Sequence, residues 1–240
     1  MNEKFCGLNR DQLKIIAAIS MTSDHIGYMI FPDAIALRIT GRLAFPLFSY
    51  FIWQGSKYTH DKKKYLSGLL ILGLLCILGY YVYCREIYLN SLISFSMSLC
   101  ILYGIQYFKN KAKQNDIKRG LRGLSASALC IFVSYLVCKN VFVDYGFQGV
   151  MLPVFAEVFD SFQDNKISER FNLNPSLLGF ATGLIWLSYS MGGTEFFSLF
   201  SLPLLIFYNG QKGKYNLKGF FYWFYPLHLL AIGAIAAVIG

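Results

Sequence analysis

Apolar runs that are about long enough to cross a bilayer recur along this chain of 240 residues, and they constrain its fold more than any other feature. A membrane-spanning helix needs about 20 mainly apolar residues, whereas a β-barrel shows short segments of alternating hydrophobicity. The runs predict helices at 12–31, 35–55, 65–83, 88–108, 120–139, 146–162, 174–191, 194–208 and 218–239. We therefore expect an all-α integral membrane protein, a polytopic helical bundle of about nine transmembrane helices in a single domain, 1–240. The run 194–208 is short for a span.

Composition supports this class and excludes others. Apolar residues make up 55% of the chain and charged residues 15%, whereas soluble domains carry about 25% charge. The net charge of +9 raises the question of nucleic acid binding. The basic residues, however, lie in short gaps between the apolar runs, which is typical of membrane topology. We expect the lipid bilayer as a partner and no nucleic acid.

The basic gaps also predict an orientation. Of the 22 lysines and arginines, 18 lie in the N-terminal segment as far as Lys14, or in the gaps after the second, fourth, sixth and eighth runs and the first residues of the runs that follow these gaps. Cytoplasmic loops of membrane proteins are enriched in these residues. The sequence thus predicts a multi-pass protein of the cell membrane with a cytoplasmic N-terminus and an external C-terminus.

Four ionisable residues lie inside the predicted spans, where such groups are rare and usually functional. They are Asp24 and His25 in 12–31, Arg42 in 35–55, and His228 in 218–239. At 1.5 Å per residue, His25 lies roughly 20 Å along its helix from the cytoplasmic end, at a depth similar to that of Arg42. These groups can therefore converge, although their depths alone do not require it.

Lys14 and His25 are predicted to share one helix face, since eleven residues at about 100° each end about 20° past three full turns. A long ligand with an anionic head and a reactive tail would meet both. A neutral imidazole can act as general base toward an amine or hydroxyl, and an arginine can stabilise developing negative charge. Asp24 points about 100° away from His25, so it either orients the imidazole through a neighbour or pairs with Arg42.

Structural interpretations compete at each of these positions. Asp24 and Arg42 are candidates for a buried ion pair, and His25 for a hydrogen-bonded interhelical histidine. His228 follows Pro226, which can serve only to kink the helix. With two histidines at membrane depth and no cysteine cluster, we expect no metal centre.

Several motifs resemble one known family. They are Leu13-Lys14-Ile15-Ile16, Ser23-Asp24-His25-Ile26-Gly27, Phe31-Pro32-Asp33, Leu37-Arg38-Ile39-Thr40-Gly41-Arg42-Leu43-Ala44-Phe45-Pro46, Asn90 with Ser94, Asp144-Tyr145-Gly146 with Gly149, Tyr208-Asn209-Gly210 with Lys212, and Phe221-Tyr222 with Phe224-Tyr225-Pro226-Leu227-His228-Leu229. The chain resembles the TraX family over nearly its whole length. That family is named for the protein that acetylates the N-terminus of conjugative F-type pilin, and it is distantly similar to the acyltransferase type 3 membrane enzymes.

The resemblance implies an acyltransferase. Type 3 enzymes carry a basic residue, ten intervening residues and an essential histidine in the first helix, a pattern that Lys14 and His25 match. The implied reaction transfers an acyl group, most simply acetyl, from cytoplasmic acetyl-CoA to an amino group of a protein or peptide, with His25 as general base. The expected catalytic residues are His25, Asp24 and Arg42. The expected donor-binding residues are Lys14, Arg38, Asn209, Lys212 and His228.

Two other functions remain open. One is an O-acyltransferase that modifies a cell-surface glycan, and the other is a non-enzymatic transporter or assembly subunit. The absence of visible internal repeats in the sequence weighs mildly against a transporter. Turnover of acetyl-CoA separates an enzyme from the last alternative, and the identity of the acceptor separates N- from O-acylation.

Overall fold

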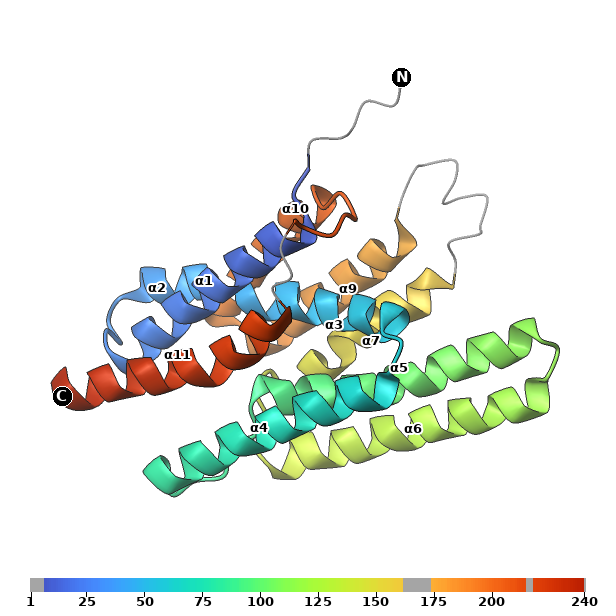
Figure 1. The fold of residues 1–240 in the computed structure, drawn as a ribbon, viewed down its shortest axis with the longest axis horizontal. Helices are drawn as coiled ribbons and strands as arrows, with labels where there is room; N and C mark the ends of the chain where they lie inside the picture. Colours follow the sequence, from blue (N-terminus) through green and yellow to red (C-terminus); the bar gives the residue numbers. More distant parts are fainter. Residues whose placement is uncertain (1–6, 162–173, 215–217, 240) are drawn as a thin grey trace. The chain divides into compact units, whose positions relative to one another are not determined.

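A computed structural model of the chain describes residues 7–161, 174–214 and 218–239 (Figure 1). The regular structure of these residues is helical, apart from two isolated backbone bridges. The α-helices are α1 (Arg10–Met29), α2 (Ile35–Gly41), α3 (Ala44–Tyr58), α4 (Lys62–Cys84), α5 (Ser91–Lys113), α6 (Ile117–Asn140), α7 (Gly146–Asp160), α9 (Pro175–Met191), α10 (Ser201–Ile206) and α11 (Lys218–Ile239). A 3-10 helix, η1, spans Gly193–Phe200. The predicted all-α class is confirmed for the described residues.

Five segments of the described chain are long and apolar enough to cross a membrane, not the nine predicted. They are Ile35–Tyr58, Lys62–Val82, Ser91–Lys113, Ile117–Asn140 and Gly219–Ile239. The other predicted spans are too short or too polar. α7 and α9 have 15 and 17 residues, and the predicted helix 194–208 is η1 followed by the six residues of α10. α1 has 20 residues but interrupts its apolar sequence with ionisable and hydroxyl side chains. The predicted end at 162, with the basic Lys166 and Arg170, lies outside the described residues.

The predicted helix 35–55 is broken at Arg42 and Leu43, which separate α2 from α3. Pro46 explains the break, because proline lacks an N–H and its ring clashes with the carbonyl four residues earlier, here that of Arg42. The Arg42 N–H instead bonds to Ile39 O at 3.2 Å, a tighter turn than an α-helix makes. The break places the Arg42 side chain at a corner of the backbone, and this residue is only 8% exposed.

The chain forms two compact units. The first comprises Met1–Phe48 and Ser188–Gly240, and the second comprises Ser49–Leu187. Their boundaries fall inside α3 and α9, so each of these helices contributes residues to both units. The single domain expected over 1–240 stays a prediction.

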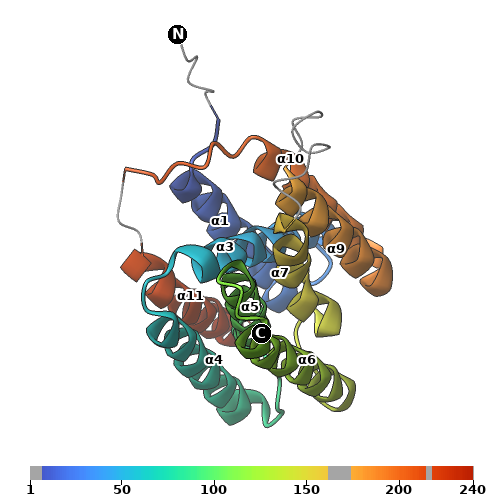
Figure 2. The same cartoon turned by 90° about the vertical axis from the view of Figure 1, so that its right-hand side faces the viewer.

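In the second unit, α5 lies beside α4 and α6, as Figure 2 shows. Small residues let α5 and α6 approach closely, as is common between membrane helices. A Cβ at Gly104 would lie 2.6 Å from Gly123 O, and the Ser127 hydroxyl donates to Ile101 O at 2.9 Å. Asn90 caps α5 and also donates to Gly73 O of α4 at 2.9 Å. Backbone contacts through small and polar residues therefore hold these helices together.

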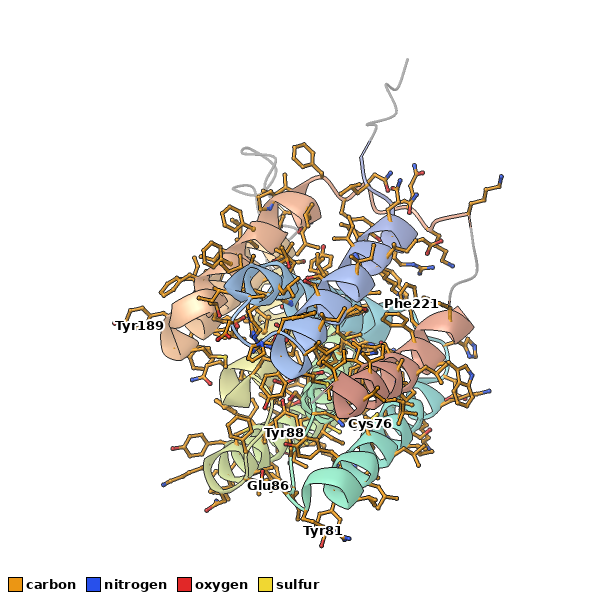
Figure 3. The ribbon with its side chains drawn as sticks, turned by 90° about the vertical axis from the view of Figure 1, so that its left-hand side faces the viewer. Cys76, Tyr81, Glu86, Tyr88, Tyr189 and Phe221 are labelled. Carbon is orange, nitrogen blue, oxygen red and sulfur yellow. The ribbon has the colours of Figure 1, made fainter. Side chains whose placement is uncertain are left out.

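The outer surface of α4 is apolar. Leu74, Leu75 and Leu78 are each 58% exposed, and Cys76 and Tyr81 also project from this helix (Figure 3). A helix that exposes apolar side chains over such a length is stable only in an apolar medium. This surface fits contact with lipid chains, and the chain is a membrane protein.

In the first unit, α1 packs on both α2 and α11. The Ser23 hydroxyl donates to Leu37 O at 3.1 Å, and the Ser20 hydroxyl donates to Thr40 O. Gly41 allows the close approach, since a Cβ there would lie 2.8 Å from the Asp24 Cα. Hydroxyl and glycine contacts thus join α1 to α2 along one face.

Candidate functional site

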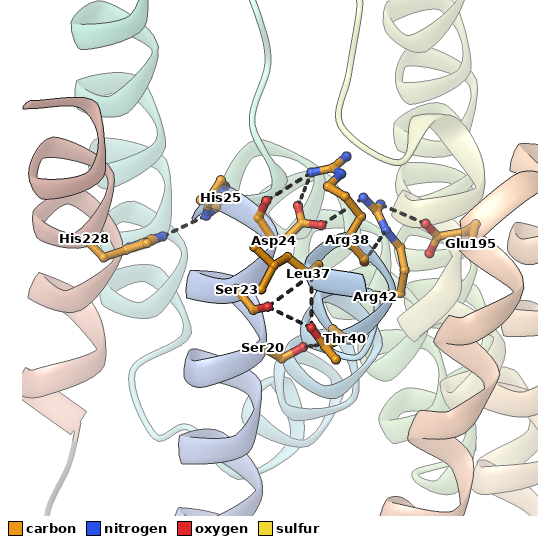
Figure 4. A network of polar contacts seen from close by, with 10 residues as sticks. All are labelled: Ser20, Ser23, Asp24, His25, Leu37, Arg38, Thr40, Arg42, Glu195 and His228. Carbon is orange, nitrogen blue, oxygen red and sulfur yellow. Dashed lines mark hydrogen bonds and ion pairs between the residues drawn. The ribbon is translucent and has the colours of Figure 1, made fainter. Parts of the chain in front are cut away.

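The Asp24 carboxylate of α1 bridges two arginines from the α2 corner (Figure 4). Arg38 Nη1 donates to Asp24 Oδ2 and Arg42 Nη2 donates to Asp24 Oδ1, both at 2.9 Å. Arg38 and Arg42 are one helical turn apart, so both guanidinium groups reach the same carboxylate. Of the two roles left open for Asp24, the structure shows the pairing with Arg42 and adds Arg38.

A second carboxylate, Glu195 of η1, completes what we call the arginine cluster: Asp24, Arg38, Arg42 and Glu195. Arg42 Nη1 donates to Glu195 Oε2 at 3.0 Å, and Glu195 is only 3% exposed. Two carboxylates and two guanidinium groups balance in charge, as burial requires. Glu195 was not among the residues predicted from the sequence, although an acidic residue inside the predicted helix 194–208 satisfies the same rule that singled out Asp24.

On the other side of α1, His25 faces His228 of α11 (Figure 4). His25 Nδ1 lies 3.0 Å from His228 Nε2, and the two ring centroids are 4.9 Å apart. His228 is 7% exposed, and its Nδ1 lies 2.8 Å from Phe224 O. The four groups therefore meet in two separate pairs of contacts, because Asp24 meets the arginines and His25 meets the second histidine.

Lys14 lies against the same helix as His25. Its Nζ is 5.5 Å from the centroid of the Phe221 ring. Phe221 lies about two helical turns before His228 in α11. Because Lys14 meets Phe221 and His25 meets His228, α1 and α11 run in the same direction. The predicted common face of Lys14 and His25 is confirmed, since both contact α11.

The loop after α10 lies beside the beginning of α1. Arg10 N donates to Gln211 O at 3.0 Å, and Leu8 forms a parallel bridge with Tyr208. Asn209, an expected donor-binding residue, donates to Gly7 O through Nδ2 at 3.0 Å and accepts from Gln211 N through Oδ1 at 3.0 Å. Both groups of its side-chain amide thus hold this loop against the N-terminal segment.

The loop brings positive charge to the first turns of α1. Lys212 and Lys214 are exposed and flank Gly213. Gly213 lies against Asp11, because a Cβ added to the glycine would meet the aspartate side chain. Asp11 lies one turn before Lys14. Lys14, Lys212 and Lys214 therefore belong to the same end of α1, about 16 Å along the helix axis from His25.

An open apolar cavity of ≈ 420 Å³ lies along α1. Ile15, Ile19 and Ile26 line it from α1, and Leu37 and Phe224 line it from α2 and α11. The Phe224 ring stacks on His228, with centroids 4.9 Å apart and an interplanar angle of 9°. The cavity therefore reaches an aromatic ring that also contacts the histidine pair.

The second unit holds another charge cluster, built around a buried glutamate that was not among the residues predicted from the sequence. Glu157 of α7, 2% exposed, accepts from Lys109 Nζ at 2.6 Å and from Trp53 Nε1 at 3.0 Å. Lys57 Nζ donates to Asp160 Oδ2 at 2.8 Å. We call Lys57, Lys109, Glu157 and Asp160 the lysine cluster. Glu157 lies inside the predicted helix 146–162, so the membrane-depth rule could have found it.

Gln106 of α5 extends the lysine cluster. Its Nε2 donates to Ser56 Oγ at 2.7 Å and approaches Glu157 Oε2 at 3.3 Å, and its Oε1 accepts from Lys62 Nζ at 2.8 Å. The cluster thus ties α3, α4, α5 and α7 together. Across 7–161, 174–214 and 218–239, no three His, Cys, Asp or Glu side chains are placed to hold a metal ion.

These features define a class of helical membrane protein. Its first described helix, α1, carries a charge-balanced ion cluster on one side and, on the other, a histidine that pairs with a histidine of the last described helix, α11. The chain belongs to the TraX family. The model of this family, which is described as TraX protein, matches residues 9–236. The family assignment made from the motifs is therefore confirmed.

Two relatives are similar to this chain. A probable fimbrial assembly protein FimC, serogroup H1, of Dichelobacter nodosus is 24% identical over 233 residues, which cover 91% of each chain. An uncharacterized protein, RP591, of Rickettsia prowazekii (strain Madrid E) is 36% identical over 102 residues. That match covers 42% of this chain and 38% of the Rickettsia protein, less than two thirds of its length. No solved structure matches the chain.

Proposed function

We propose that this protein is a membrane acetyltransferase that transfers acetyl from cytoplasmic acetyl-CoA to an amino group of a fimbrial or pilin-type protein, with His25 as general base. The observation that carries the proposal is the placement of His25. It lies on the face of α1 that also carries Lys14, and its imidazole is hydrogen-bonded to a second buried histidine. An imidazole held in this way is suited to take a proton from an amine.

The basic end of α1 fits an anionic donor. Lys14, Lys212 and Lys214 supply ammonium groups that suit the phosphates of coenzyme A as point charges. The distance of about 16 Å along the helix from Lys14 to His25 suits a long ligand whose reactive end lies away from its phosphates. The concentration of basic residues at the N-terminus and in alternate gaps between the apolar runs supports a cytoplasmic origin for the donor.

The proton balance of the reaction assigns a task to His25. His25 takes the proton that the amine loses as its nitrogen bonds to the thioester carbonyl carbon. It returns this proton to the coenzyme A sulfur as the carbon–sulfur bond breaks. The products are an amide and the free thiol, so no other reactant is needed.

The arginine cluster supports the site from the opposite side of α1. All three nitrogens of the Arg42 guanidinium have partners in the protein: Asp24, Glu195 and Arg38 O. In the proposal, Asp24 and Arg42 fix the α1–α2 corner that carries His25. Arg38, whose side chain is 28% exposed, is the guanidinium closer to solvent.

A protein acceptor is favoured over a glycan by two findings. The Dichelobacter relative, similar over 91% of this chain, is named as a probable fimbrial assembly protein. The cavity along α1 is apolar, which suits a hydrophobic polypeptide segment better than a sugar.

The test uses the full-length protein in lipid nanodiscs with radiolabelled acetyl-CoA and a fimbrial subunit from the same genome. We expect label on the subunit, and mass spectrometry should place the acetyl group on an amine. Label on a glycan fraction instead would favour the O-acyltransferase alternative. Absence of acetyl-CoA turnover with either acceptor would contradict the proposal.

A further inference from the structure

His228 makes two hydrogen bonds that together define where its proton lies. Its Nδ1 is 2.8 Å from Phe224 O, and its Nε2 is 3.0 Å from His25 Nδ1. A carbonyl oxygen only accepts hydrogen bonds, so His228 Nδ1 must carry hydrogen. In a neutral imidazole the other nitrogen is then an acceptor. His228 Nε2 therefore presents a lone pair to His25.

The proton of His25 is fixed in turn. If His228 Nε2 accepts, the donor in the 3.0 Å contact is His25 Nδ1. The neutral His25 ring then carries its hydrogen on Nδ1 and its lone pair on Nε2. A cationic His228 would donate through Nε2 and leave His25 with hydrogen on Nε2, the tautomer that cannot take a proton there.

We propose that His228 is a positioning residue that holds His25 in the Nδ1–H tautomer, so that Nε2 of His25 is the basic atom of the site. This inference rests on the proposed function for its catalytic consequence, but the tautomer itself does not depend on any reaction. His228 was predicted from the sequence as a donor-binding residue, and its hydrogen bonds support this different task.

The surroundings of His228 hold its ring in the required orientation. The Phe224 ring lies parallel to it at 4.9 Å, and the Tyr225 ring meets it edge-on at 5.7 Å. The Nδ1 bond to Phe224 O stays within one helical turn, so it does not depend on the approach of another helix. α11 thus presents His228 Nε2 to α1 in a fixed direction.

The arrangement has a consequence for catalysis. When His25 Nε2 takes a proton, the imidazolium donates through Nδ1 to the His228 lone pair and is stabilised there. A general base oriented by a third group is the common pattern of activated nucleophilic sites. Here the orienting group is neutral, so the pair adds no charge to the apolar interior until the proton is transferred.

The first measurement is the tautomer. The chain has three histidines, so side-chain nitrogen NMR of ¹⁵N-histidine-labelled protein in nanodiscs gives a small set of signals. His60→Gln and His25→Ala assign the spectrum, because His60 is exposed and far from the pair in sequence. We expect a protonated Nδ1 and an unprotonated Nε2 for His25, and the appearance of Nε2–H in His228→Leu. Hydrogen on His25 Nε2 in the unaltered protein, or a spectrum that His228→Leu leaves unchanged, overturns the inference.

The second measurement is turnover of the same variants. His228→Leu should lower kcat about 10- to 100-fold, by analogy with the loss of a group that orients a metal-bound histidine, with the donor KM unchanged. His228→Gln places an amide oxygen near the position of Nε2 and should restore most of kcat, whereas a merely structural role would predict no such rescue. A raised donor KM with unchanged kcat would instead assign His228 to donor binding. If the unaltered protein shows no turnover, the proposed function fails while the NMR result still decides the tautomer.

Discussion

The arginine cluster and the lysine cluster each contain two acidic and two basic side chains, but different groups lie beside them. The arginine cluster shares α1 with a pair of imidazoles. The lysine cluster instead lies beside side chains that form hydrogen bonds but do not take up or release protons in the ordinary pH range. They are Trp53, Gln106 and Ser56. Of the two regions, only the first therefore combines buried charge with imidazole nitrogens that can accept a proton.

This difference indicates that burial of charge alone does not mark a functional site. In the lysine cluster, both oxygens of Glu157 accept hydrogen bonds from Lys109, Trp53 and Gln106, which leaves a closed network between helices. We interpret this cluster as structural. In the first unit, the balanced ion cluster fixes one face of α1 and the histidine pair lies on another.

The largest expected effect on stability is that of Arg42→Ala. It removes a cation from Asp24 and from Glu195, so two carboxylates lose a partner, and removal of one partner from a buried pair costs about 3–5 kcal/mol. Asp24 keeps Arg38, whereas Glu195 loses its Arg42 bond. Arg42→Ala combined with Glu195→Gln should therefore recover more stability than Arg42→Ala with Asp24→Asn. Thermal unfolding in detergent measures the order, and the reverse order would contradict this account of the cluster.

The matched change in the second unit is Lys109→Ala, which leaves Glu157 without its ammonium partner at 2.6 Å. The loss should again be about 3–5 kcal/mol, and Glu157→Gln in the same chain should restore much of it. The two clusters should then separate in activity. The Lys109→Ala, Glu157→Gln protein should recover both stability and acetyl-CoA turnover, whereas the Arg42→Ala, Glu195→Gln protein should recover stability without full turnover. Lost turnover in a stable Lys109→Ala, Glu157→Gln protein would assign function to the second cluster.

A smaller effect is expected at the α1–α2 contact. Gly41→Ala would place a methyl group against the Asp24 side chain and within 2.8 Å of the Asp24 Cα, so the helices must move apart. Overpacking of this kind costs about 1–3 kcal/mol. Because Gly79 has no atom within 4 Å of its added Cβ, Gly79→Ala is a matched control that should not destabilise. Equal unfolding temperatures for the two variants would show that the close approach at Gly41 is unimportant.

The smallest effect is expected for Lys14→Ala. If Lys14 meets a donor phosphate as a partly exposed point charge, its loss should cost about 1 kcal/mol, or about a fivefold higher donor KM, and the difference should shrink at high salt. Lys63→Ala, a change of an exposed lysine in the second unit, serves as the control. A donor KM that is the same in both variants and in the unaltered protein would leave Lys14 as a topological anchor.

How far the sequence predicts this structure depends on the kind of signal. Hydropathy identified the helical class and the five apolar spans, because run length and composition act locally. Helical spacing placed Lys14 and His25 on one face, which the contacts with Phe221 and His228 confirm. The break at Arg42 was within reach as well, since Pro46 disfavours helix at the carbonyl four residues earlier.

The partners of the ionisable residues were harder to predict. Glu195 meets Arg42 although the two residues are 153 positions apart in the sequence. Tertiary packing decides this contact, and local sequence patterns do not predict it. The pairing of Glu157 with Lys109 was equally out of reach, because the sequence indicated only that Lys109 belongs to a basic loop. Sequence reasoning could find which groups require partners at membrane depth, and the fold decides which partners they receive.

Turnover of acetyl-CoA by His25→Ala, compared with the unaltered protein at equal folded fraction in nanodiscs, tests the central claim most directly. A general base contributes typically about 10²–10⁴-fold, so the account predicts a fall in kcat of that size. The fold should survive, because alanine leaves no unpaired charge in the apolar interior. Turnover near that of the unaltered protein would contradict the assignment of His25 as the base.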